Sequence, residues 1–146
     1  MRGYFEIGVY APKHEVNVGT LWRSAYQLGA AGIFIVGGRF AKQSSDTYGA
    51  WKHIPLRVFA DWKDFLKARP YAAPLIAVEM GGTPLRTFTH PERAIYLMGA
   101  EDNGLPQRVL KDCQQVVSLE ASGQTSYNVA VAGSIVMYDR VFGRDR

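Results

Sequence analysis

The stretch that decides the fold is "NVGTLWRSAYQLGAAGIFIV", residues 17–36, in which the spacing of apolar residues changes from helical to strand-like. In its first part apolar residues recur every three or four positions, which predicts a helix over Asn17–Leu28 that ends at Gly29 and Gly32. The next four residues, Ile33–Val36, are all apolar, as expected of a parallel strand buried on both faces. A helix that leads into such a strand is typical of an α/β protein.

The same alternation continues along the rest of the chain. Further strands are expected at Tyr4–Tyr10, Val58–Phe59, Leu75–Val78, Ala94–Met98 and Val116–Leu119. Further helices are expected at Asp61–Lys67, Pro106–Cys113 and Asn128–Val141. This alternation predicts an α/β fold with a mainly parallel sheet and helices on both faces. The length of 146 residues predicts a single domain over residues 1–146.

Composition excludes several classes of protein. Hydrophobic residues make up 47% of the chain, which argues against disorder. The single cysteine, Cys113, allows no intrachain disulfide and suits the reducing cytoplasm. Glu6 interrupts the apolar run near the N-terminus, and no window is long enough to span a membrane, so neither a signal peptide nor a membrane anchor is expected. The net charge of +4 weakly favours a polyanionic partner such as RNA.

Metal ions and phosphate-bearing cofactors are not expected from the sequence. The three histidines, His14, His53 and His90, have no carboxylate or cysteine at ligand spacing. Glu101 and Asp102 are adjacent but lack a third ligand nearby. The chain contains neither a Walker P-loop nor a G-x-G-x-x-G turn, which argues against ATP and NAD but not against a cofactor without phosphates.

Three polar loops follow expected strands: "APKHEVN" (11–17), "GAEDNG" (99–104) and "EASGQTSYN" (120–128). In parallel sheets ligands bind beyond the carboxyl ends of the strands, so we expect these loops to form one site. A fourth polar loop, residues 37–55, is long enough that a functional role is expected.

Each loop also has a simpler structural interpretation. Asn17 and Asn128 are good helix N-caps. Arg23 lies near the positive end of its helix dipole, so it is either an ordinary surface arginine or the partner of an anion. Gly99 and Gly104 suit either a plain turn or a close approach of ligand to backbone. The last helix is apolar most of the way round, which favours burial against a second subunit.

Three segments in this order, "NVGTLWR" (17–23), "LMGAEDNG" (97–104) and "SYNVAVAG" (126–133), resemble the motifs N-x-G-x-x-x-R, G-x-E-x-x-G and S-x-N-V/L of one family. This is the SpoU or TrmH family within the SPOUT superfamily of RNA methyltransferases, and the resemblance covers nearly the whole chain. It implies a C-terminal deep trefoil knot, a homodimer formed through the knot helices, and S-adenosylmethionine (SAM) as cofactor. The implied reaction is methylation of an RNA ribose 2′-hydroxyl. Without an appended RNA-binding domain, the chain resembles the minimal TrmL-like type that acts on the tRNA wobble ribose.

The resemblance also implies roles for individual residues. Arg23 would be catalytic by holding a phosphate and polarising the hydroxyl, in its own subunit or across the dimer, and Asn17 would orient that neighbourhood. The implied cofactor-binding residues are Val78, Gly99, Glu101, Gly104, Ser118, Leu119, Ser126, Asn128 and Val129. Expected RNA contacts, with solvated surface charge as the alternative, are Lys13, Arg23, Arg39, Lys42 and Lys52.

Three other functions remain open from the sequence. The enzyme could methylate rRNA instead of tRNA, or it could be a catalytically inert RNA-binding member of the same fold. A relative that methylates a base nitrogen is the third alternative, although such relatives generally lack the N-x-G-x-x-x-R motif.

Overall fold

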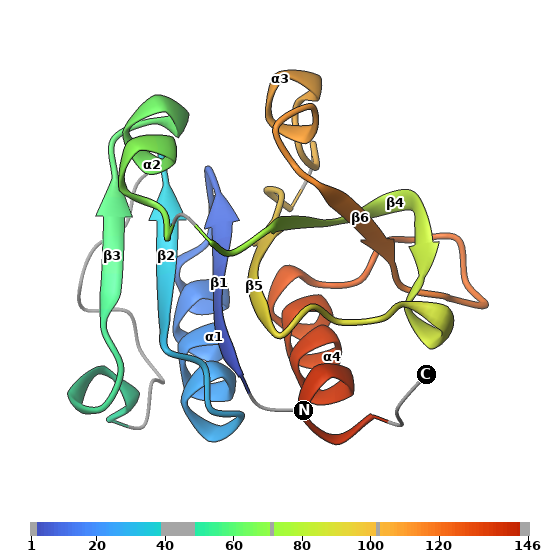
Figure 1. Cartoon of the computed structure of the whole chain (residues 1–146), viewed down its shortest axis with the longest axis horizontal. Helices are drawn as coiled ribbons and strands as arrows, with labels where there is room; N and C mark the ends of the chain where they lie inside the picture. Colours follow the sequence, from blue (N-terminus) through green and yellow to red (C-terminus); the bar gives the residue numbers. More distant parts are fainter. Residues whose placement is uncertain (1–2, 39–48, 71, 102, 144–146) are drawn as a thin grey trace.

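The computed structural model describes residues 3–38, 49–70, 72–101 and 103–143 (Figure 1). Its strands are β1 (Tyr4–Tyr10), β2 (Gly32–Val36), β3 (Leu56–Phe59), β4 (Leu75–Pro84), β5 (Arg93–Met98) and β6 (Gln115–Ser118). Its helices are α1 (Glu15–Gln27), α2 (Trp62–Ala68), α3 (Gln107–Leu110) and α4 (Val129–Phe142), with short 3-10 turns η1 (Ala50–Lys52) and η2 (Leu85–Thr87). None of these helices combines the length and the apolar character that crossing a membrane requires.

The six strands form one sheet in the order β3-β2-β1-β5-β4-β6, and every pairing between them is parallel. Figure 1 shows β3, β2 and β1 side by side with their arrowheads at the same end. The register of β4 against β6 shifts between Val78 and Thr83, so the intervening residues bulge out of the ladder. These observations confirm the predicted α/β class and the mainly parallel sheet.

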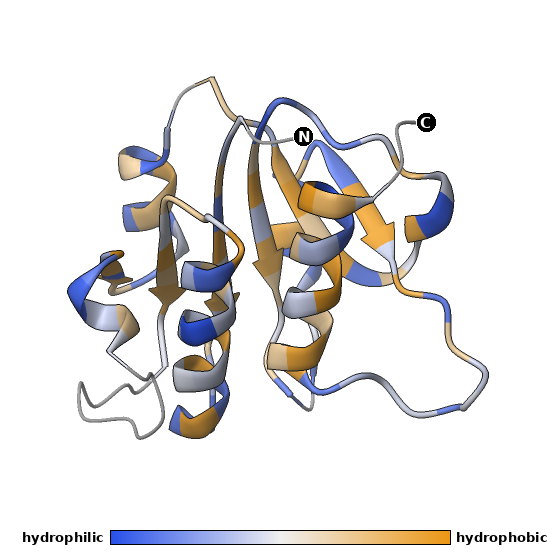
Figure 2. Ribbon diagram, turned by 90° about the horizontal axis from the view of Figure 1, so that it is seen from below, coloured by the Kyte–Doolittle hydropathy of each residue, from blue (hydrophilic) through white to orange (hydrophobic). Residues whose placement is uncertain are grey.

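Helices cover both faces of the sheet, as predicted. On one face, Leu21 of α1 and Met137 of α4 belong to the same buried cluster as Tyr96 of β5. On the other face, Phe65 of α2 and Val109 of α3 belong to a second buried cluster. Neighbouring residues of β5 alternate between the two clusters because side chains of a strand alternate between the faces of its sheet. The central strands β2 and β5 contribute to both clusters, which explains why their sequences have no polar face; Figure 2 shows the apolar colouring of the strands against the mixed colouring of the helices.

Small residues allow α4 to pack closely against α1 and β5. A Cβ atom added to Gly133 would lie 2.7 Å from Cδ1 of Leu21 and 2.8 Å from Cε of Met98. The opposite side of α4 is exposed, with 46% of Val131, 60% of Tyr138 and 64% of Phe142 accessible to solvent. This chain therefore covers only one side of the apolar helix, and the second subunit stays a prediction. The knot likewise stays a prediction.

A buried polar cluster fastens the C-terminal end of α4 to the start of β5. Arg140 is only 2% exposed, and its guanidinium donates to the carbonyl oxygens of Pro91 at 2.6 Å and Glu92 at 2.7 Å. His90 contacts the Tyr96 hydroxyl through Nδ1 and a carboxylate oxygen of Asp139 through Nε2. Burial raises the pKa of Tyr96 to about 12, so this hydroxyl keeps its proton at neutral pH.

Three local predictions were wrong. The helix expected at Pro106–Cys113 is the short α3, Gln107–Leu110, because Pro106 is its N-cap and turn hydrogen bonds follow it at Asp112 and Cys113. Helix α1 begins at Glu15 and not at Asn17, so Asn17 lies inside the first turn and is not the N-cap. The reason is a long-range contact, because the Asn17 side chain accepts a hydrogen bond from Asn128 instead of capping its own helix. Strand β4 extends to Pro84 and not only to Val78, since pairing with β6 resumes after the bulge. Asn128, by contrast, is the N-cap of α4, as predicted.

The Arg140 cluster generates a prediction about stability. Arg140→Met removes a buried guanidinium and leaves the carbonyl oxygens of Pro91 and Glu92 without their donor, so we expect a loss of about 2–4 kcal/mol in the free energy of unfolding. Urea denaturation measures this loss. The control is Arg86→Met, which removes an exposed ion pair with Glu120 and should cost less than about 0.5 kcal/mol. Equal effects of the two substitutions would contradict the proposed role of Arg140.

Candidate functional site

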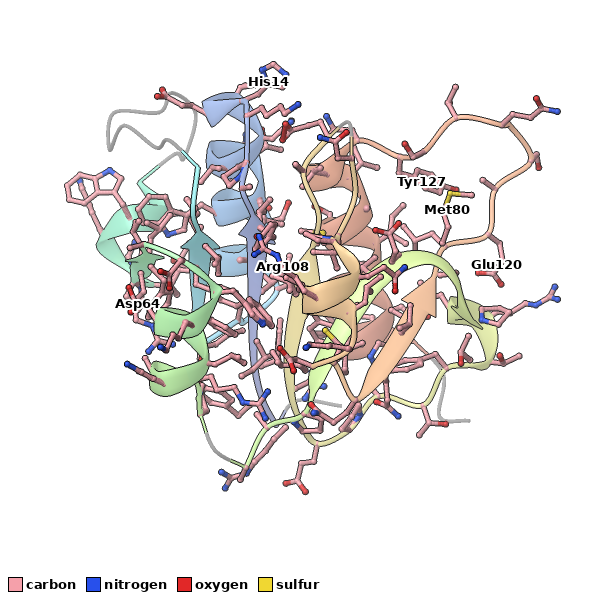
Figure 3. The ribbon with its side chains drawn as sticks, turned by 90° about the horizontal axis from the view of Figure 1, so that it is seen from above. His14, Asp64, Met80, Arg108, Glu120 and Tyr127 are labelled. Atoms are coloured by element: carbon pink, nitrogen blue, oxygen red, sulfur yellow. The ribbon has the colours of Figure 1, made fainter. Side chains whose placement is uncertain are left out.

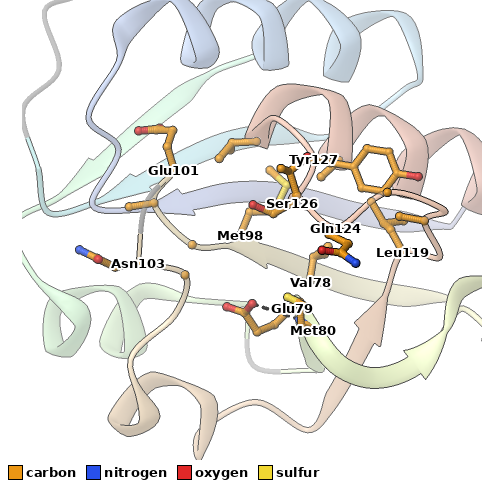
Figure 4. Close-up of a pocket in the computed structure, with 18 residues that line it drawn as sticks. Val78, Glu79, Met80, Met98, Glu101, Asn103, Leu119, Gln124, Ser126 and Tyr127 are labelled. Atoms are coloured by element: carbon orange, nitrogen blue, oxygen red, sulfur yellow. Dashed lines mark hydrogen bonds between the residues drawn. The ribbon is translucent and has the colours of Figure 1, made fainter.

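A cavity of about 680 Å³ lies at the carboxyl ends of β4, β5 and β6 (Figure 4). Its lining comes from residues 78–80 at the bulge of β4, from Met98 at the end of β5 and residues 99–101 and 103–104 after it, and from Leu119, Ala121 and residues 123–127 after β6. Val129 and Ala132 of α4 complete the lining. These segments meet because the strands that carry them are parallel and end at one edge of the sheet. Met80, 81% exposed, and Tyr127, 40% exposed, form part of its rim, and Figure 3 places them on the same side of the molecule.

All but two of the residues predicted to bind a cofactor line this cavity: Val78, Gly99, Glu101, Gly104, Leu119, Ser126 and Val129. Ser118 and Asn128 do not line it. The Ser118 hydroxyl donates to the carbonyl oxygen of Glu79 at 2.7 Å and accepts from the amide of Gly82 at 2.6 Å. Ser118 therefore stabilises the bulge of β4 by two hydrogen bonds, and this bulge places Glu79 in the wall of the cavity.

Glu79 is the most informative residue that sequence analysis missed. Its carboxylate accepts hydrogen bonds from the amide of Leu105 at 2.8 Å and from its neighbour Met80 at 3.0 Å. The first of these bonds ties the bulge of β4 to the loop that follows β5. A glutamate directly after the apolar run 75–78, at the carboxyl end of an expected strand, was the signal that could have identified it. Other lining residues that sequence analysis did not single out include Met80, Met98, Asn103, Gln124 and Tyr127.

The turn after β5 requires both of its glycines. A Cβ atom on Gly99 would lie 2.2 Å from the carbonyl carbon of Gly104. Gly104 has a φ of +63°, and a Cβ atom there would lie 2.4 Å from Oε2 of Glu79. The amide of Gly104 also donates to the carbonyl oxygen of Ala100 at 3.2 Å. The tight turn brings backbone, rather than side chains, to the wall of the cavity.

Glu101 offers an acceptor at the cavity. Its Oε2 accepts from the backbone amide of Lys13 at 3.1 Å, which joins the loop after β1 to the loop after β5. Its Oε1 is buried and has no hydrogen-bond partner among the residues that the structure describes. Since buried carboxylate oxygens almost always have a partner, this atom suits a ligand that carries a hydroxyl or another hydrogen-bond donor.

Two asparagines join the N-terminal ends of α1 and α4. Oδ1 of Asn128 accepts from the amides of Ala130 at 2.9 Å and Val131 at 3.2 Å, which leaves its Nδ2 to donate to Oδ1 of Asn17 at 2.9 Å. Two positive helix ends therefore lie together beside the cavity, because Val129 is both the first residue of α4 and part of the lining. The first and third motif loops thus meet, as the sequence predicted.

Of the cations expected to contact RNA, the three that the structure describes lie outside the cavity lining. Arg23 is half-buried on α1 and is not among the described lining residues. At 100° per residue, it lies about 120° around the helix from Asn17. Lys13 and Lys52 are exposed, the former after β1 and the latter in η1. Arg39 and Lys42 lie outside the described residues.

Residues 4–138 match the model of a protein family described as the SpoU rRNA Methylase family. The matched range includes the three sequence motifs and all of the described cavity lining. Among curated proteins, the chain is similar to an uncharacterized tRNA/rRNA methyltransferase of Archaeoglobus fulgidus, with 28% identity over 128 residues, covering 84% of this chain and 57% of that protein. The chain thus spans little more than half the length of this relative.

Two solved structures share the fold. An AdoMet-bound rRNA methyltransferase from Sinorhizobium meliloti superposes with a TM-score of 0.84 and 25% identity, covering 96% of this chain and 56% of that one. A structure described as giving insights into the 2-OH methylation of C/U34 on tRNA superposes with a TM-score of 0.85 and 26% identity. In that comparison 98% of this chain and 92% of the other chain are covered, so the two are similar in length.

The pair of asparagines can be tested by a double-mutant cycle. Asn17→Ala and Asn128→Ala should each destabilise the protein, and Asn128→Ala should cost about 1 kcal/mol more because it also removes the cap of α4. We expect the combined variant to lose about 1 kcal/mol less than the sum of the single losses, because the bond between the two side chains can be lost only once. Urea denaturation gives all the values.

The matched control combines Asn17→Ala with Asn103→Ala, an exposed asparagine of the neighbouring loop. These two effects should add. Additive effects of Asn17→Ala and Asn128→Ala would show that the two side chains are not coupled.

Proposed function

Because the chain belongs to the SpoU rRNA methylase family, we propose that it transfers a methyl group from SAM to the ribose 2′-hydroxyl of an RNA. In this proposal residues 1–146 act as a single domain, and the substrate is tRNA, at the wobble position. The observation that carries the proposal is the cavity at the carboxyl ends of β4, β5 and β6, which the second and third motif loops build and the Asn17–Asn128 pair adjoins.

The cavity fits SAM in size and chemistry. Its volume of about 680 Å³ lies within the range typical of small-molecule sites. Val78, Leu119 and Val129 offer apolar contacts for an adenine ring, and Oε1 of Glu101 offers a buried acceptor for a hydroxyl group. The similarity to an AdoMet-bound rRNA methyltransferase supports the same choice. When bound, SAM supplies an electrophilic methyl carbon on a sulfonium ion.

Arg23 would act on the RNA and not as a base. A guanidinium does not give up its proton in proteins, so Arg23 would hold a phosphate, polarise the 2′-hydroxyl and leave the proton to pass to the phosphate. Asn17 would orient this neighbourhood through its bond to Asn128. Holding the two reacting groups in line contributes much of the expected rate enhancement.

We further propose that the enzyme is a homodimer in which Arg23 serves the cavity of the partner. The position of Arg23 outside the cavity of its own chain supports this arrangement. A groove of about 640 Å³ between α1 and α4 also supports a homodimer. Its lining includes Leu28, Ile135 and Tyr138, and a second subunit would bury these apolar side chains.

Similarity to a solved structure supports tRNA as the substrate. The structure described as giving insights into the 2-OH methylation of C/U34 on tRNA superposes on this chain with a TM-score of 0.85 and 26% identity. rRNA remains the second candidate because the family model and the structure from Sinorhizobium meliloti both carry it in their descriptions. A catalytically inert RNA-binding protein is a weaker alternative, since the three motifs are intact.

The first test measures transfer of radiolabelled methyl from SAM to unmodified tRNA and, separately, to rRNA. We expect label on tRNA, at linkages that resist alkaline cleavage because the 2′-hydroxyl is blocked. Arg23→Ala should reduce the rate by roughly a hundredfold or more, since it removes a charged group that stabilises the transition state. Arg23→Lys keeps the positive charge but loses the planar guanidinium, which can donate two parallel hydrogen bonds to a phosphate. This variant should recover only part of the rate.

The control for this test is Arg93→Ala, an exposed arginine at the amino end of β5, the opposite end from the cavity. It should transfer methyl at the wild-type rate. Label on rRNA alone would overturn the tRNA assignment, and label at alkali-sensitive linkages would overturn the ribose assignment. Full activity of Arg23→Ala would remove Arg23 from the mechanism.

The cofactor site can be tested by filling the cavity. Ala132 lies on α4 and lines the cavity, so Ala132→Leu should weaken SAM binding by roughly tenfold or more in a calorimetric titration. Ala68→Leu, at an exposed position of α2, is the matched control and should bind like the wild type. An Ala132→Leu protein with wild-type stability and wild-type SAM affinity would place the cofactor elsewhere.

A further inference from the structure

An exposed aromatic patch lies at η1, away from the lining of the cavity. It consists of Trp51, which is 57% exposed, Tyr26 of α1, which is 42% exposed, and His53, which is exposed as well. The rings of Tyr26 and His53 stack with centroids 4.4 Å apart and an angle of 13° between their planes. None of the described cavity-lining residues belongs to this patch.

Residues that precede and follow Trp51 and His53 in the chain are anchored to the core, and this holds the patch in place. Ala50 is fully buried, and its carbonyl oxygen accepts from the amide of Ile54 at 3.1 Å. The carbonyl oxygen of Ile54 in turn accepts from the indole nitrogen of Trp22 at 3.1 Å. The turn between these anchors therefore presents Trp51 and His53 to solvent in a fixed arrangement, and their exposure does not come from a loose chain end.

The chemistry of the patch differs from that of the other exposed aromatic pair. Tyr138 and Phe142 contact each other on α4, beside the apolar groove. In the patch, by contrast, Nζ of Lys52 lies 5.5 Å from the centroid of the Trp51 ring. An open aromatic face beside a flexible cation matches a nucleotide, since the ring stacks on the base and the cation reaches the phosphate.

The patch is also close to the residue proposed to hold the RNA. Tyr26 follows Arg23 by three positions on α1, so their side chains are neighbours on the helix surface. A phosphate at Arg23 would therefore place an adjacent nucleotide of the same strand within reach of the patch.

We propose that the aromatic patch is a stacking site for an unpaired base of the RNA substrate, with Trp51 as the main stacking surface and Lys52 on the neighbouring phosphate. This inference rests on the proposed function, because it takes RNA as the substrate. It adds a requirement for a single-stranded segment, since bases inside a duplex have no free face. Stacking tolerates every base, so the patch recognises unpaired RNA and not a sequence.

The three tryptophans of the chain make this proposal directly measurable. Trp22 and Trp62 are 4% and 9% exposed, and both indole nitrogens donate hydrogen bonds within the protein, whereas Trp51 is 57% exposed. Quenching of tryptophan emission on RNA binding therefore reports on Trp51. We expect a single-stranded oligoadenylate to quench the emission of the full-length protein, and a fully paired RNA duplex of equal length to quench it far less.

Variants then separate stacking from charge. With a fluorescently labelled oligoadenylate, binding by Trp51→Ala should be weaker by roughly tenfold, in line with the loss of one base–aromatic stack. Trp51→Phe keeps an aromatic face and should recover most of the affinity. Val58→Ala, which shortens another exposed apolar side chain (58% exposed) on β3, should bind like the wild type.

The outcomes distinguish this inference from the proposed function when the same preparations are assayed for methyl transfer. Methyl transfer to RNA with no quenching, or with unchanged affinity of Trp51→Ala, overturns the stacking site and leaves the enzyme intact. Quenching that needs Trp51, without methyl transfer to any RNA, supports the stacking site and counts against catalysis. A wild-type protein that neither binds nor methylates RNA overturns both.

Discussion

Parallel pairing forces all six strands of this sheet to end at the same edge, and the candidate site depends on that constraint. The strands come from distant parts of the sequence, yet the sheet brings the loops after β1, β5 and β6 close to the bulge of β4. Hydrogen bonds from backbone amides then fix these segments to one another: the amide of Lys13 donates to Glu101 at 3.1 Å, and the amide of Leu105 donates to Glu79 at 2.8 Å. The sheet sets which loops meet, and these few polar contacts set the shape of the cavity between them.

Helix α1 serves three purposes on three of its faces. Leu21 and its apolar neighbours pack on the sheet, and Asn17 reaches the start of α4. The remaining surface carries Arg23 and Tyr26, which the proposals assign to RNA. In the proposed enzyme, RNA would approach the surface of α1 that carries Arg23 and Tyr26, while Asn17 holds the start of α4 beside the cavity from another side of the helix.

Most of the fold could be predicted from the sequence because the central strands, such as β2 and β5, are buried on both faces and therefore appear as short, almost wholly apolar runs. Local rules failed where distant residues decide the structure. Asn17 looks like an N-cap, but its partner is Asn128, 111 residues away, and no local pattern reveals that bond. Strand β4 continues past a bulge because β6 pairs with it again at Thr83 and Pro84. The motifs located the loops of the site, whereas Glu79 became apparent only from its bond to Leu105.

The two ends of α4 are fastened independently, by Asn128 to Asn17 at one end and by Arg140 to Pro91 and Glu92 at the other. Any shift or tilt of α4 would therefore break the hydrogen bonds at one of its ends. The segment before it, residues 120–127, is exposed throughout. We therefore expect residues 120–127, and not α4, to move when the cavity opens. A small molecule would then enter and leave by a local movement, without unfolding of the whole protein.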